Sequence, residues 1–210
     1  MTITHLWRSI FRPSLIAIGL LAMLSPCLAE APGGEIVKYG NSELRKTPAQ
    51  GRIFFGDSGF LLEAPPNSFR LEYVDQTIAP SQYLYPWLGT PFGRFRMHAY
   101  PTGTTQQEAL QKSVDILDER KKNPNNTAYS FLRSESLTTR EGLPLVVGYF
   151  GYPGYQEGYN IGKISFYFRS EKCVTYCICC EPWSKYRVDA AQTVGLVVRT
   201  LREGAAKPNP

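Results

Sequence analysis

Apolar positions along the chain follow two different spacings, which predict many short strands and two helices. Glycine, proline and polar residues bound short apolar or alternating runs, and these runs predict strands at 52–55, 60–64, 69–74, 92–100, 129–134, 145–150, 163–169 and 173–180. Apolar residues at helical spacing predict helices over 104–122 and 186–201. Each helix has a single apolar stripe, as expected for a helix packed on one face of a sheet. We therefore expect an α+β fold, an antiparallel-dominated β-sheet covered by helices in an α-β-α sandwich.

The first 29 residues have the layout of a signal peptide. Arg8 and Arg12 precede an apolar run over 15–24 that is too short to span a bilayer comfortably. Cleavage after Ala29 would place small residues at both positions that a leader peptidase inspects. We expect an exported protein, periplasmic or secreted. The alternative is a lipid anchor at Cys27, because residues 24–27 resemble a lipobox, although proline stands where that motif has glycine or alanine.

The remaining chain predicts one domain between two flexible ends. Residues 30–50 are rich in glycine, proline and charge and predict a flexible leader, and 204–210 predict a disordered tail. A single α+β domain is expected over 51–203. Removing the signal peptide lowers Lys+Arg from 23 to 21 against 18 Asp+Glu, so the net charge falls from +5 to +3. This mild excess gives no basic stripe, so we expect no nucleic-acid partner, and no second apolar run predicts a membrane span.

The order of the predicted elements resembles that of the Mog1/PsbP-like superfamily. The matching pieces are the strand at 69–73 after a proline pair, the helix at 104–122, the hairpin from 164–168 to 174–176, and the closing helix at 186–201. The resemblance covers about residues 52–202. It implies an α-β-α sandwich that serves as a binding or assembly module, with no shared catalytic site. The chain departs from the family pattern in its glycine- and tyrosine-rich loop and in its cysteines.

Alternation in the strand at 92–100 places a set of cationic residues on one face. Arg94, Arg96 and His98 share that face with Tyr100, whereas the residues between them are apolar. One interpretation is a cationic strip for an anionic ligand or partner. The other is a solvated sheet face, because antiparallel sheets commonly expose one side.

The strand at 173–180 carries four cysteines. Strand geometry places Cys173, Cys177 and Cys179 on one face and Cys180 on the other, and neither spacing nor direction suits a disulfide along one strand. Three interpretations remain: buried small thiols, a local disulfide made possible by a bulge, or a soft-metal site for Cu(I) or Zn. The last two would make the chain a thiol-based metal-binding or redox protein.

The segment 149–159 joins two predicted strands and is rich in glycine and aromatic residues. Glycine and proline interrupt the strand there, so Tyr152, Tyr155 and Tyr159 are candidates for a surface that contacts a protein or glycan partner. The alternative is a hairpin loop whose rings fold onto the core.

The sequence offers no recognisable catalytic constellation. Residues 56–59 resemble the nucleophile motif of chymotrypsin-like proteases, but the histidine available after signal-peptide removal, His98, follows Ser58 instead of preceding it. A β-turn explains the four residues. We therefore expect a non-enzymatic accessory or binding domain that needs no cofactor.

Overall fold

The computed structural model describes residues 34–39, 42–55, 58–75, 83–123, 129–151, 161–182 and 188–204. Most of these residues lie in strands, and two segments form helices. The strands are β1 (Glu35–Tyr39), β2 (Ser42–Phe54), β3 (Phe60–Tyr73), β4 (Tyr83–Thr90), β5 (Gly93–Ala99), β6 (Ser130–Thr138), β7 (Pro144–Gly151), β8 (Ile161–Arg169), β9 (Thr175–Glu181) and β10 (Arg202–Glu203). The helices are α1 (Gln106–Lys121) and α2 (Ala190–Thr200).

All described strands belong to one antiparallel sheet. Its order is β1-β2-β3-β4-β5-β9-β8-β7-β6, and β10 pairs with β3. The sheet folds back over itself: the ring of Phe60 in β3 lies 4.7 Å from that of Phe168 in β8, although three strands separate β3 from β8 in the sheet order. The largest core cluster therefore joins residues from both halves of the same sheet.

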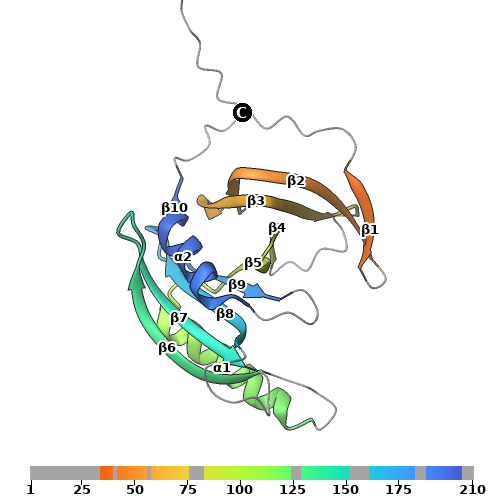
Figure 1. The fold of residues 1–210 in the computed structure, drawn as a ribbon. Coiled ribbons are helices and arrows are strands. Elements are labelled where there is room, and N and C mark those ends of the chain that lie inside the picture. Colours follow the sequence, from red (N-terminus) through yellow and green to blue (C-terminus); the bar gives the residue numbers. More distant parts are fainter. Residues whose placement is uncertain are drawn as a thin grey trace, which may run out of the picture. The chain divides into compact units, whose positions relative to one another are not determined.

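The two helices pack on opposite faces of the sheet. Leu196 and Val197 of α2 belong to the core cluster enclosed by the folded sheet. Leu110 and Leu117 of α1 pack in a second cluster against the other face, with Tyr167 of β8 and two cysteines of β9. Figure 1 shows α1 on the side of β6–β8 that faces away from β2 and β3. Helix α1 begins with a capping box between Thr105 and Glu108.

The predicted α-β-α sandwich is wrong. The chain forms mostly antiparallel strands, and its helices of 16 and 11 residues do not cover the sheet. The physical reason is that strands take the place of a helical layer: Phe60 of β3 contacts the rings of both Phe168 and Tyr176 across the core. Large aromatic side chains of the sheet thus bury one another, and a second helical layer is not needed there.

The structure also changes the prediction of a flexible leader over 30–50. Strand β1 and the first part of β2 lie in that range, and β2 pairs with β3 from Leu44 opposite Tyr73 onward. Leu44 is buried in a small cluster with Leu71 and Trp87. Proline, glycine and charge in this range indicated a loop, but cross-strand pairing and burial of Leu44 stabilise it as strand. Residues 1–33 and 205–210 lie outside the described ranges.

Ser58, which belongs to the segment that resembles a protease motif, bonds to the backbone between β2 and β3. The Ser58 hydroxyl donates a hydrogen bond to the Phe55 carbonyl over 2.6 Å and accepts one from the Phe60 amide over 3.2 Å. Ser58 is buried, so its hydroxyl satisfies backbone groups of the turn. Among the residues described, no helix is long and apolar enough to cross a membrane.

Candidate functional site

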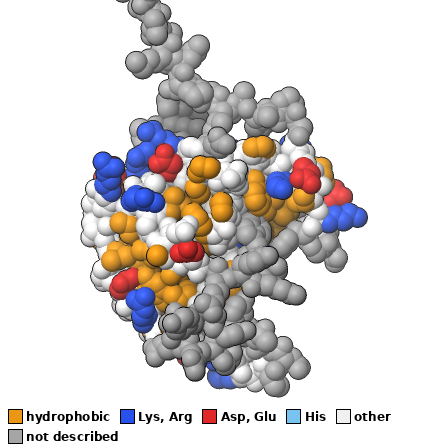
Figure 2. Space-filling view, viewed as in Figure 1, with side chains coloured by type: hydrophobic (Ala, Val, Ile, Leu, Met, Phe, Trp, Pro, Cys, Tyr) orange, Lys and Arg blue, Asp and Glu red, His pale blue; other side chains and the backbone are white. Residues whose placement is uncertain are grey.

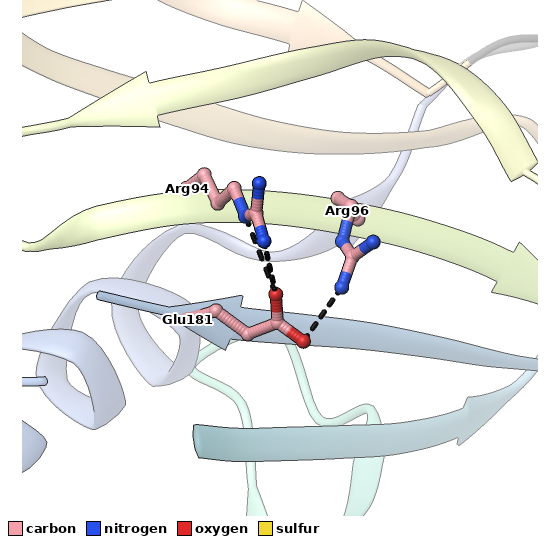
Figure 3. A network of polar contacts seen from close by, with 3 residues as sticks. All are labelled: Arg94, Arg96 and Glu181. Atoms are coloured by element: carbon pink, nitrogen blue, oxygen red, sulfur yellow. Dashed lines mark hydrogen bonds and ion pairs between the residues drawn. The ribbon is translucent and has the colours of Figure 1, made fainter. Parts of the chain in front are cut away.

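The predicted cationic face is built around one carboxylate, that of Glu181. Strand β5 buries Phe95 and points Arg94 and Arg96 to the other face, as alternation along a strand requires. Arg94 donates from Nε and one Nη to Glu181 Oε2 over 3.2 and 2.9 Å, and Arg96 pairs with Oε1 at 2.6 Å. Figure 3 shows the guanidinium groups of Arg94 and Arg96, both on β5, pointing toward the carboxylate of Glu181 on β9.

An aromatic ring lies beside the two guanidinium groups. Their central carbons lie 5.9 Å and 5.7 Å from the ring centre of Trp87 in β4, within the range of a cation–π contact. The side chains of Arg94 and Arg96 keep 19% and 17% of their surface exposed. The arginines are thus fixed in position by the ion pairs and the ring, and they still reach solvent.

Cations outnumber carboxylates among the described residues of the site. Lys163 of β8 adds a third cation within electrostatic range of Glu181. Burial would raise the pKa of Glu181, but Arg96, Arg94 and Lys163 outweigh it and hold that pKa below its usual value. Glu181 is therefore ionised at neutral pH. The described residues place one carboxylate among three cations.

His98 lies next to this group but does not add a charge at neutral pH. Burial, then Lys163 and Arg96, lower its pKa from 6.5 to about 4. His98 Nε2 lies 3.3 Å from the Tyr100 hydroxyl, which lies 2.9 Å from Ser113 Oγ of α1. The structure thus places Arg94, Arg96 and His98 on one face, but the charged part of that face consists of the two arginines with Lys163.

Three residues of the site were not identified from the sequence. Glu181 and Lys163 lie on strands distant in the chain from β5, and Glu181 is separated from Arg94 by 87 positions, whereas Trp87 lies on β4, the strand directly before β5. One signal for Glu181 was its place directly after the apolar run that ends at Cys180, where an acid ends a buried strand. Nothing in the sequence alone indicated its partner.

The cysteines of β9 do not converge on one point. Cys177 and Cys179 face α1, whereas Cys180 lies in the core cluster on the opposite face. All three are buried and free, and burial raises the pKa of both Cys177 and Cys180 well above its usual range. Among the described residues, no group of three or more histidine, cysteine or acidic side chains could hold a metal ion. This geometry is that of packed neutral thiols.

Of the aromatic loop 149–159, the structure describes residues 149–151. Tyr149 and Phe150 belong to β7 and are buried, and the Tyr149 hydroxyl donates to Glu135 while Arg133 lies 3.9 Å above its ring. These two rings therefore pack in the fold. The candidate contact residues Tyr152, Tyr155 and Tyr159 lie outside the described ranges.

Comparison with known proteins adds no relationship to these observations. No protein-family model matches the chain, and a search of curated proteins finds no matching sequence. The resemblance to the Mog1/PsbP-like superfamily stays a prediction from the order of the elements.

Proposed function

We propose that the folded part of this chain is a non-enzymatic binding domain of an exported protein, and that Arg94 and Arg96 form its contact surface for an acidic partner. The observation that carries the proposal is the pair of guanidinium groups held side by side against Trp87 by one shared carboxylate. Arginine suits recognition of carboxylates because its planar donors match their geometry, and prior ordering lowers the entropy cost of binding.

The charge balance favours an anion over other ligands. Arg94, Arg96 and Lys163 surround Glu181, so an incoming carboxylate would meet a positive potential in a partly buried site. The side chains reach solvent in part, which lets a group on a partner's surface contact them without unfolding the domain. We infer that the ligand presents a carboxylate, carried by an acidic peptide or by an acidic glycan.

Binding of two defined probes tests this function. We expect an oligoglutamate peptide or an oligogalacturonate to bind the purified protein at low ionic strength and to weaken as salt is added. The test variant changes Arg94, Arg96 and Glu181 together to glutamine, which removes both cations without leaving a buried carboxylate alone. We expect it to lose binding by about tenfold or more, as for the loss of charge-assisted hydrogen bonds.

The matched control is Arg133→Gln, because Arg133 pairs with Glu135 on β6 and its side chain is 56% exposed. It should bind as the unchanged protein does. Equal binding by the triple variant, or no binding of either probe at low salt, contradicts the proposed surface. The preference between the peptide and the glycan identifies which class of partner carries the carboxylate.

The aromatic loop remains a second predicted contact for the same domain. Replacing Tyr152 and Tyr155 with alanine should leave the fold intact and weaken partner capture, because large rings bury much area at small entropic cost. Unchanged capture of the probe that binds best would remove the loop from the contact surface. The export prediction rests on residues 1–29, which lie outside the described ranges.

A further inference from the structure

A cavity lies where the turns at one end of the sheet meet the start of α1. Its volume is about 560 Å³, within the range typical of small-molecule sites. The β6–β7 turn, the β8–β9 turn, β10 and the first residue of α1 line it. Seven polar side chains contribute to the lining: Gln106, Glu141, Arg169, Ser170, Glu171, Arg202 and Glu203.

The cavity combines charges of both signs that do not pair with one another. Neither arginine and none of the three glutamates forms an ion pair with another residue in the part of the chain that the structure describes. The Nε atom of Arg169 is buried and has no hydrogen-bond partner there. A buried guanidinium donor without a partner costs free energy, which a bound acceptor would recover. Figure 2 shows basic and acidic side chains mixed at the upper left, the end where Figure 1 labels β10.

Hydrogen bonds hold the turns that carry these charges. The amide of Thr139 donates to the Leu143 carbonyl over 2.9 Å, and that of Arg140 donates to the Val198 carbonyl of α2 over 2.7 Å. In the β8–β9 turn, the Ser170 amide donates to the Val174 carbonyl over 2.9 Å. The lining is therefore ordered before any ligand arrives, and ordered sites bind with a smaller entropic cost.

The signs of the charges select a class of ligand. A simple anion would satisfy Arg169 but would meet three carboxylates, and a simple cation would leave the buried guanidinium donor without an acceptor. Glu171 and Glu203 lie within electrostatic range of each other: burial and then Glu171 raise the pKa of Glu203, and Lys172 opposes them to a smaller extent. A positive group near these two carboxylates would relieve their repulsion.

We propose that this cavity binds a small zwitterion, with its carboxylate toward Arg169 and Arg202 and its ammonium group toward Glu171 and Glu203. The site is separate from the Arg94–Arg96 surface and does not depend on the function proposed for it. Opposite charges on one molecule satisfy both sets of side chains at once, and the cavity is large enough for a free amino acid.

Titration with unbranched amino acids of increasing length tests the proposal. Glycine, β-alanine, 4-aminobutyrate and 6-aminohexanoate differ in the separation of ammonium and carboxylate, so the best binder reports the spacing of the site. We expect amide NMR signals of Gly142 and Ser170 to shift saturably with at least one of them at millimolar concentration. The N-acetyl and the amide derivatives of that ligand, each lacking one charge, should bind about tenfold more weakly.

Two variants locate the binding. Arg169→Gln and Glu203→Gln should each weaken it about tenfold, whereas Arg120→Gln, an exposed change near the C-terminal end of α1, should not. Glu203 is exposed, so we expect Glu203→Gln to fold normally. It therefore tests the site even if Arg169→Gln does not fold. The proposal is overturned if no amino acid in the series shifts these signals, or if the derivatives lacking one charge bind equally well.

Discussion

Arg94 and Glu181 lie directly opposite each other across β5 and β9, and two nitrogens of the Arg94 guanidinium donate to the same oxygen of Glu181. Arg96 reaches the other oxygen diagonally, because its own register partner is Cys179. One carboxylate therefore orients two cations. The junction between β5 and β9 also connects the two halves of the sheet in the strand order, so this residue links the candidate site to the stability of the fold.

Replacement of Glu181 by glutamine should destabilise the protein by about 2–4 kcal/mol at pH 7, because it leaves two largely buried guanidinium groups without their shared carboxylate. Urea-induced unfolding measures the change. The matched control is Glu72→Gln, since Glu72 pairs with Arg70 at 2.6 Å but both side chains are about one-third exposed. A pair that is more accessible to solvent contributes less, about 0–1 kcal/mol at the surface, so equal losses in the two variants would contradict the importance of the more buried pair.

The ion pair also predicts a loss of stability in acid. The pKa of Glu181 in the folded state lies below its usual value of 4.5, because the three cations outweigh burial. Its contribution is therefore complete above pH 4.5 and declines as the pH falls through the lower, folded pKa. The difference in unfolding free energy between the unchanged protein and Glu181→Gln should shrink below pH 4.5. A difference that stays constant to pH 3 would show that the three cations do not stabilise the ionised form of Glu181.

The face of β5 could be predicted from the sequence because it depends on alternation within one strand. Phe95 points into the core and Arg94 points away from it, which follows from the strand's period of two. The partner of Arg94 could not be predicted in this way, because it depends on which distant strand pairs with β5 and in which register. The prediction of the fold class was wrong for a similar reason. Phe60 packs on Phe168 across the folded sheet, and no local sequence pattern predicts that contact.

Burial of His98 predicts a second, separate pH dependence. Its pKa is about 4 in the folded state and 6.5 when exposed, so the unfolded chain binds the proton more readily between these values. The contribution of neutral His98 is complete above pH 6.5 and is lost as the pH falls toward 4, on the order of 3 kcal/mol in total. His98→Gln should remove this slope between pH 4 and 6.5, measured by urea unfolding. A titration of the His98 ring by NMR with a midpoint near 6.5 would contradict the prediction.

The thiols of β9 should react slowly in the folded protein. Cys177, Cys179 and Cys180 are at most 2% exposed, whereas Cys173 is exposed in the turn before β9. The thiolate is the reactive form, and burial raises the pKa of Cys177 and Cys180, so alkylation must await local opening of the strand. Intact mass spectrometry of the signal-free chain should show one rapid iodoacetamide adduct under native conditions and four after denaturation, and Cys173→Ser should remove the rapid one. Packed neutral thiols offer neither a nucleophile nor a set of metal ligands. Rapid modification of two or more thiols, or a native mass that includes a bound metal ion, would therefore favour the thiol-based metal-binding or redox function instead.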